Sequence, residues 1–340
     1  MRPTPPIQES GMPEESEYSD DVDFMNEDKD VLTALLPTAT NIFREWSLEI
    51  NVQKTEFVHV FIADPNEKLD DGSKLRGHEP WRTTKLLGSL LCSSADILHR
   101  INLSNIAFKS FKKVWLNGSK ISLERKLRIY EAQVVSVLLY NSGCWSAPKV
   151  VMEKLDTCHR KHLRSILNVR WPVSVMSNST LYKRCKTNKL SDRVKRSRLR
   201  LLGHILRSPE SSPGQSALCF VVNSITSSKL KGRLGRHSTN LLSTLKKDIE
   251  SFNLYIDHMD NYVIHSTQLQ YSFPNKNFQM LTLSDYSDIL ILRQLACDRE
   301  RWASIFKLSE KYYLLSVLKF SSGTDNILKM LFMRYFVYFK

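Results

Sequence analysis

Two adjacent carboxylates near the amino terminus are the residues of this chain best suited to chemistry. They are Asp20 and Asp21, in the run Tyr18-Ser-Asp-Asp-Val-Asp-Phe24. Hard divalent cations prefer oxygen ligands, so such a pair on a tight turn between strands suits Mg²⁺ or Mn²⁺. Two bound ions can align a nucleophile and stabilise the phosphoryl group during its transfer. Because the surrounding segment is acidic, a solvated pair without a role is the alternative.

Positive charge is concentrated in the middle of the sequence. The 340 residues carry a formal net charge of +14. Between His99 and Arg207 there are 24 Lys or Arg against 5 Asp or Glu, whereas residues 1–31 are acidic. Such a surplus predicts a polyanionic partner, with nucleic acid first and an acidic membrane surface second.

Cysteine usage and hydropathy predict an intracellular chain that does not cross a membrane. The six cysteines are scattered and form no CxxC pair, as expected of reduced thiols. The amino terminus has no apolar core of the kind found in secretory signals. The apolar segment 327–339 is too short to span a bilayer and contains Lys329 and Arg334.

Strands are expected early in the chain and helices later. Alternation over 56–61 favours a strand, and 64–84 is polar and loop-like. A helix over 31–46 would bury Val31, Leu35, Ala39, Ile42 and Trp46, with a kink or interruption at Pro37. Ser122 is the expected N-cap of the helix that follows it. Apolar spacing predicts further helices over 149–169, 191–206, 241–252 and 289–306, whereas 208–230 is a Ser-rich linker and 255–285 has no clear period.

Basic residues on these helices are candidate phosphate contacts. In 191–206, Val194, Leu201 and Ile205 share an inward face, which predicts that the basic residues lie largely outside. Lys and Arg on such faces bind phosphate without reading sequence. The candidates are Lys109, Lys112, Lys113, Arg160, Lys161, Arg164, Arg193, Lys195, Arg196, Arg198 and Arg200.

Aromatic, histidine and cysteine residues in the same region have a structural and a functional interpretation. Trp115, Tyr130, Trp145 and Trp171 could stack on bases, although aromatics at these spacings are more often core. Cys158, His159 and His162 lie within one helical turn, but no second ligand pair accompanies them, so packing is favoured over a zinc site. His204 is interpreted as a buried or hydrogen-bonded histidine.

Three motifs in order resemble those of reverse transcriptases from non-LTR, LINE-like retrotransposons. Tyr18-Ser-Asp-Asp21 resembles the YADD motif, with Ser19 in place of Ala. The segment Leu48–Glu56 resembles the motif that follows, and Lys85-Leu-Leu-Gly88-Ser89 is similar to the "YLGS" turn. The resemblance implies that Asp20 and Asp21 are catalytic metal ligands for Mg²⁺ or Mn²⁺ and that Lys54 is a catalytic residue near the incoming nucleotide. It also implies that Gly88 and Ser89 contact the primer.

The resemblance continues to about residue 306. The helical region after residue 93 looks like the thumb of that family, and Gly203-His-Ile-Leu-Arg207 resembles its "GHxLR" motif. Lys231–Arg236 and Ala296–Trp302 match the end of such reading frames. RNA and DNA are the implied partners, and nuclear residence would follow from the life cycle of the family.

The family's first catalytic Asp and its fingers lie upstream of YADD, and only seventeen residues precede Tyr18 here. We therefore expect a catalytically incomplete polymerase fragment, with exposed strand edges in its sheet and a complementing segment as a candidate partner. A non-enzymatic RNA- or DNA-binding helical module and a non-functional pseudogene product are the alternatives.

The expected fold class is α+β, a partial palm with a small antiparallel sheet followed by a mostly helical region. The expected divisions are a disordered head at 1–17, a partial palm at 18–92, a basic helical thumb and connection at 93–207, a C-terminal helical region at 208–306 and a divergent tail at 307–340.

Overall fold

The chain folds into two compact units, each containing helices and small antiparallel sheets. The computed structural model describes residues 15–18, 21–26, 28–61, 63–64, 66–116, 121–170, 172–226, 240–257, 262–265, 278–306 and 335–339. The N-terminal unit comprises 1–92, 208–224 and 318–340, and the helical unit comprises 93–207 and 225–317. The mixture of helices and antiparallel sheets agrees with the α+β class expected from the sequence.

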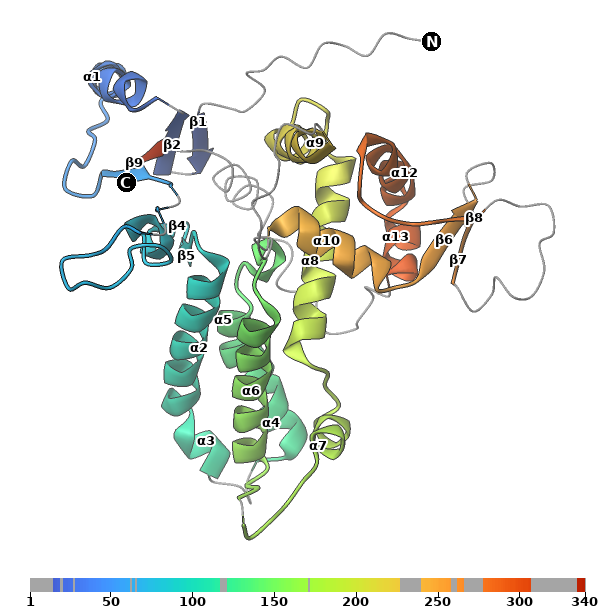
Figure 1. Cartoon of the computed structure of the whole chain (residues 1–340). Helices are drawn as coiled ribbons and strands as arrows, with labels where there is room; N and C mark the ends of the chain where they lie inside the picture. The colour runs from blue at the N-terminus through green and yellow to red at the C-terminus, as the bar shows by residue number, and fades with distance from the viewer. Residues whose placement is uncertain are drawn as a thin grey trace. The chain divides into compact units, whose positions relative to one another are not determined.

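A four-stranded antiparallel sheet forms the centre of the N-terminal unit (Figure 1). Its order is β1 (Glu15–Tyr18), β2 (Asp21–Asn26), β9 (Tyr335–Phe339) and β3 (Glu56–His59). β9 pairs with β2 on one side and with β3 on the other. The end of the predicted tail therefore supplies a second neighbour for β2, and the outer strands of the sheet are β1 and β3. The predicted head is also ordered in part, since residues 15–17 belong to β1; its first 14 residues lie outside the described residues.

Helix α1 (Lys29–Glu45) connects β2 to β3 and packs on the sheet through a face that overlaps the predicted one only in part. Leu32 is buried against Val22 and Phe24, and Ala39 is the other buried residue of the helix. The contact with the sheet, and not the longest apolar stripe, decides which side faces inward. Three members of the predicted face are exposed: Val31, Ile42 and Trp46.

Pro37 lies inside α1, and the helix continues across it. Of the two predicted outcomes, a kink or an interruption, the interruption is therefore excluded. Proline removes one backbone hydrogen bond from a helix, and Pro37 is exposed to solvent, where the carbonyl left without its helical donor can be hydrated.

A short hairpin follows, formed by β4 (Lys85–Leu86) and β5 (Ser89–Leu90). Its two turn residues, Leu87 and Gly88, have φ values of 46° and 78°. A two-residue hairpin with positive φ at both central positions is a type I′ turn, whose twist matches that of the strands. Glycine suits the second position because it has no Cβ. The segment similar to the "YLGS" turn thus lies in a hairpin.

The helical unit begins with a bundle in which α2 lies along α5 and α6 (Figure 1). Ser122 caps α4, accepting a hydrogen bond from the Arg125 amide at 3.4 Å, as predicted. A π-helical turn, Glu131–Val135, follows α4. The helices of this part are α2 (Ser93–Ser110), α3 (Lys112–Leu116), α4 (Leu123–Tyr130), α5 (Ser136–Leu138), α6 (Lys149–Ile166), α7 (Asn178–Cys185) and α8 (Leu190–Arg207).

The remainder of the chain differs from the sequence prediction in three places. The predicted linker contains a helix, α9 (Pro213–Thr226). The segment without a clear period contains a three-stranded sheet in the order β7-β6-β8. The last predicted helix is two helices, because Asp298 ends one and caps the next. The elements of this part of the helical unit are α10 (Leu241–Glu250), β6 (Leu254–Asp257), β7 (Tyr262–His265), β8 (Phe278–Met280), α12 (Tyr286–Cys297) and α13 (Arg299–Ile305).

The aromatic residues that could have stacked on bases belong to the core of the bundle. Trp115, Tyr130 and Trp145 are buried among leucine, isoleucine and valine side chains. Polar atoms of all three are also engaged. Trp145 Nε1 donates to Asp96, Trp115 Nε1 donates to the Phe108 carbonyl, and the Tyr130 hydroxyl lies 2.8 Å from His159 Nδ1. The core interpretation is confirmed for these three, and Trp171 lies outside the described residues.

Helix α8 is the centre of the helical unit, in contact with α6, α10, α12 and α13. Gly203 permits the contact with α13, because a Cβ placed there would lie 2.5 Å from Trp302 Nε1. The indole of Trp302 is itself buried and donates to the Leu199 carbonyl at 3.0 Å. The glycine of the Gly-His-Ile-Leu-Arg motif therefore has a packing role.

We predict that Gly203→Ala destabilises the protein by about 1–3 kcal/mol, because a rigid buried ring must move to admit the methyl group. Urea unfolding measures the effect. Gly143→Ala is the control, since its nearest contacts would be 3.4 Å away. Equal stability of the two variants would contradict the assigned role.

Candidate nucleic-acid interface

The predicted catalytic residues lie in the N-terminal unit. Asp20 and the side chain of Asp21 lie outside what the structure describes, although the backbone of Asp21 begins β2. Lys54 is exposed in a turn closed by its own amide, which donates to the Asn51 carbonyl at 2.9 Å. Among the described residues, no group of three or more His, Cys, Asp or Glu is placed to hold a metal ion.

The predicted primer contacts occupy one hairpin with different exposure. Gly88 is exposed at the turn, whereas Ser89 is buried. The backbone of Gly88 is thus accessible for a contact, and the side chain of Ser89 faces the protein interior.

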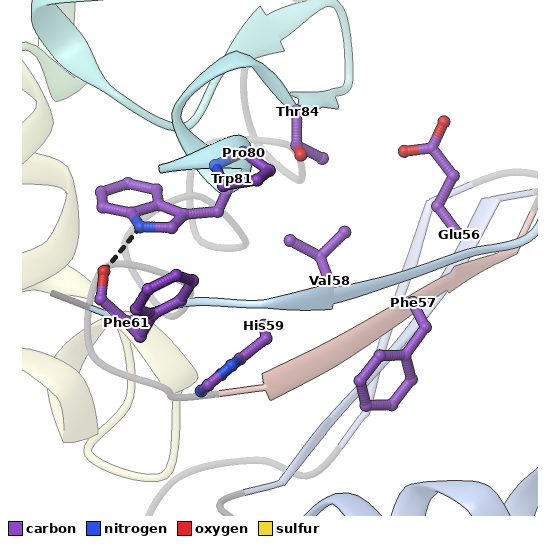
Figure 2. Close-up of a pocket in the computed structure, with 8 residues that line it drawn as sticks. All are labelled: Glu56, Phe57, Val58, His59, Phe61, Pro80, Trp81 and Thr84. Atoms are coloured by element: carbon purple, nitrogen blue, oxygen red, sulfur yellow. Dashed lines mark hydrogen bonds between the residues drawn. The ribbon is translucent and has the colours of Figure 1, made fainter. Parts of the chain in front are cut away.

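A pocket of about 340 Å³ lies beside β3 and the 3₁₀ turn Pro80–Thr83 (Figure 2). Figure 2 shows Val58 directed toward Pro80 and Thr84, with Phe57 on the opposite face of the strand. Trp81 is held by a hydrogen bond from Nε1 to the Phe61 carbonyl at 2.7 Å. Glu56 and His59 are the acid and the base of the lining, and its other side chains are apolar or aromatic apart from Thr84.

Two of the predicted phosphate contacts on α8 are internal. Arg193 makes two hydrogen bonds to the Glu131 carboxylate, at 3.1 and 2.8 Å. Arg198 makes two to Asp248, at 2.6 and 3.1 Å, and a third to the Trp145 carbonyl. Both arginines are buried, so the prediction that they lie outside is wrong. Because α8 has neighbours on several sides, its basic face is covered by other helices.

The other basic residues of α8 are half-buried. Lys195 donates to Ser251 and lies 4.3 Å from the centre of the Phe252 ring. Burial lowers the pKa of Lys195. Arg196 and Arg200 are also half-buried, so α8 as a whole contributes little fully exposed positive charge.

Two arginines of α6 hold neighbouring protein groups. Arg160 donates to the Thr157 hydroxyl at 2.8 Å, and Arg164 donates to Asn178 Oδ1 at 2.7 Å. Both are half-buried, whereas Lys161 between them is exposed. The three residues were predicted to point away from the core, which is correct for Lys161 and correct in part for the arginines.

The exposed surface of the described part of 93–207 remains strongly basic. It has thirteen exposed Lys or Arg against three exposed acids, Glu124, Glu153 and Asp192. Two of the acids are in i,i+4 pairs, with Arg128 and Lys149. The exposed basic residues are Lys109, Lys112, Lys113, Arg125, Arg128, Lys149, Lys154, Lys161, Arg170, Lys183, Arg184, Lys186 and Lys189.

Several of these residues were not among the predicted contacts, although the sequence contains a signal for them. Between Asp156 and Asp192 there is no Asp or Glu, and eight residues are Lys or Arg. Four of the eight follow the start of α7: Lys183, Arg184, Lys186 and Lys189. Absence of acids over a long stretch indicates an uncompensated surface more directly than the spacing of basic residues along a helix.

A buried polar cluster links α4 and α6 beneath this surface. The Tyr130 hydroxyl lies 2.8 Å from His159 Nδ1 and 3.4 Å from His162 Nδ1. His162 Nε2 donates to Asn105 Oδ1 at 2.9 Å, and Cys158 Sγ lies 3.6 Å from the same oxygen. The histidines and the cysteine are thus engaged in packing and hydrogen bonds.

Burial keeps both histidines neutral at physiological pH. It lowers the pKa of His159 to about 3, with the nearby Arg193 charge as a further cause. Burial also lowers the pKa of His162 to about 4. Protonation would place a cation in a core that already holds Arg193.

Comparison of the chain with models of protein families, with curated proteins and with solved structures finds no match. Among the helices that the structure describes, none has the length and apolar character needed to cross a membrane. The site is therefore interpreted from its own residues.

We predict that stability falls as pH is lowered from about 6.5 toward about 4. Over this range the two histidines bind protons in the unfolded chain but not in the folded one. The free energy of unfolding therefore falls by up to about 1.4 kcal/mol per pH unit for each histidine. Urea unfolding at pH 7, 6 and 5 measures the slope. His162→Gln should reduce the slope by roughly half, and an unchanged slope would show that this histidine is protonated equally in both states.

Proposed function

We propose that this chain binds the sugar-phosphate backbone of RNA or DNA through exposed lysines and arginines of the helical unit. The observation that carries the proposal is the excess of thirteen exposed basic residues over three exposed acids among the described residues of 93–207. Neutralising phosphates releases condensed counterions, which supplies most of the free energy of sequence-independent binding. A surface of this kind fits a backbone contact and not a base-specific one.

The ion pairs inside the helical unit support this function, because they do not neutralise the exposed basic residues. Buried arginines are paired with Glu131 and Asp248, so these carboxylates do not neutralise the outer lysines. Lys109, Lys112 and Lys113 stand at the junction of α2 and α3, and α3 contacts α6, which carries Lys161. These four lysines therefore belong to packed neighbouring helices.

We further propose that this binding unit belongs to a reverse transcriptase of the non-LTR retrotransposon kind, with the N-terminal sheet as part of its palm. The motif resemblance supports this, together with the type I′ turn at Gly88 and the β2–α1–β3 connection, in which two parallel strands are separated by one antiparallel neighbour. In such an enzyme Asp20 and Asp21 would hold Mg²⁺ or Mn²⁺, and Lys54 would lie near the nucleotide. Two-metal transfer would also require a carboxylate from another strand or from a complementing segment.

A non-enzymatic RNA- or DNA-binding module is the second candidate. The exposed basic surface favours it equally, because binding there does not require the aspartates. Substitutions of the two kinds of residue therefore separate the candidates.

We predict that the triple variant Lys109→Ala, Lys112→Ala, Lys113→Ala binds a primer–template more weakly than the unaltered chain. Each lost phosphate contact should reduce the magnitude of the slope of log K against log salt by about 0.7–0.9. Filter binding over a salt series measures this slope. The matched control, with Arg44, Lys68 and Lys74 changed to Ala, removes three exposed charges from the N-terminal unit. An identical loss in the control would show that net charge alone drives binding.

We predict that primer extension with Mg²⁺ or Mn²⁺, in the presence of the upstream reverse-transcriptase segment, is abolished by Asp20→Asn and by Asp21→Asn. Binding should be unchanged in both variants, because neither residue belongs to the basic surface. Nucleotide incorporation measured beside filter binding tests this. Binding without incorporation under every condition would favour the non-enzymatic module.

A further inference from the structure

The loop between α6 and α7 leaves the bundle through a defined helix end. Asn168 has φ 56°, the left-handed conformation common after the last helical turn. Its amide donates to the Ser165 carbonyl at 3.1 Å, and the Val169 amide donates to the Arg164 carbonyl at 2.9 Å. Asparagine tolerates this conformation better than most residues, so the direction of the loop is set locally.

Further hydrogen bonds hold the loop. The Ser174 amide donates to the Arg170 carbonyl at 2.8 Å, and the Arg170 amide donates to Ser174 Oγ at 2.9 Å. At its far end, the Met176 carbonyl accepts from Arg164 at 3.4 Å. The loop thus has a closed turn between two anchored ends.

This turn presents apolar side chains to solvent. Val173 is 91% exposed and Val175 is 83% exposed. Pro172 is exposed beside them. A single exposed apolar residue is ordinary, but one valine inside this turn and a second directly after it form an apolar tip, which we define as Pro172–Val175. Covering these apolar side chains with a partner lowers the free energy, because it removes them from water.

The charges near the apolar tip indicate the kind of partner. Arg170 opens the turn, Arg164 supports its far end, and Lys161 lies one turn earlier on α6. The tip lies within the acid-free stretch that separates Asp156 from Asp192. A partner that covers the valines therefore meets positive charge, which favours a polyanion with an apolar interior.

We propose that the apolar tip is a wedge that inserts Val173 and Val175 between base steps of a bound nucleic-acid duplex, while Lys161, Arg164 and Arg170 contact the adjoining phosphates. The proposal rests on the proposed function and adds the element that contacts the bases. Apolar wedges flanked by basic residues unstack a base step and bend the duplex, which lets more of the protein surface reach the backbone.

The experiment uses the full chain and a duplex of about 20 base pairs that contains 2-aminopurine, whose fluorescence rises when neighbouring bases unstack. The test variant is Val173→Ser with Val175→Ser, and both sites are exposed enough to tolerate serine. The control is Val150→Ser, a valine 65% exposed on the first turn of α6. Unfolding in urea confirms that both variants are folded.

We expect the unaltered chain and Val150→Ser to raise the fluorescence on binding. The double variant should bind about tenfold more weakly and leave the fluorescence low. Its salt dependence should match that of the unaltered chain, because no phosphate contact is removed.

Two results would overturn the wedge. Equal affinity and equal fluorescence for the double variant would show that the tip does not meet the bases, while salt-dependent binding would leave the proposed function standing. Loss of binding to phosphatidylserine vesicles in the double variant, with duplex binding unchanged, would assign the tip to a lipid surface. Failure of the unaltered chain to bind any duplex would overturn the proposed function itself.

Discussion

The structure of the helical unit depends on the pairing of buried guanidinium groups on α8. A helix with this many basic residues can occupy the centre of a domain only if each buried charge has a partner, because an unpaired one costs several kcal/mol. Glu131 and Asp248 provide these partners from elements on different sides of α8. Arg207 is bound in turn by the Ala296 carbonyl at 3.0 Å. These contacts specify which helices surround α8.

This constraint divides the positive charge of the chain into two classes. Arg193 and Arg198 of α8 serve the interior and are compensated by carboxylates. Lysines at the end of α2, on α3, on α6 and after α7 remain in water, where few acids accompany them. Burial keeps His159 and His162 neutral, so they add no further positive charge to the core that already contains Arg193. The surface proposed to bind nucleic acid therefore consists of basic residues that stay exposed, whereas the buried arginines are paired with carboxylates.

Several local features could be predicted from sequence because they depend on neighbouring residues. Ser122 caps its helix through its own side chain, and β3 follows from alternating branched and aromatic residues. The inward face of α1 and the burial of Arg193 and Arg198 on α8 could not be predicted in this way. For α1, contact with Val22 and Phe24 selects Leu32; for α8, neighbours on several sides bury residues of both the apolar and the basic stripe.

By itself, the sequence determined the mixed helical and strand character, the long helices of the middle region, the basic surplus and the motif order that resembles a reverse transcriptase. Each depends on composition or on spacing within a few residues. Only the tertiary structure decided that Arg193 and Arg198 are internal, that the predicted linker contains α9, and that Tyr335–Phe339 lies between β2 and β3. Burial and strand pairing depend on residues far apart along the chain, whose meeting is set by packing and not by local pattern.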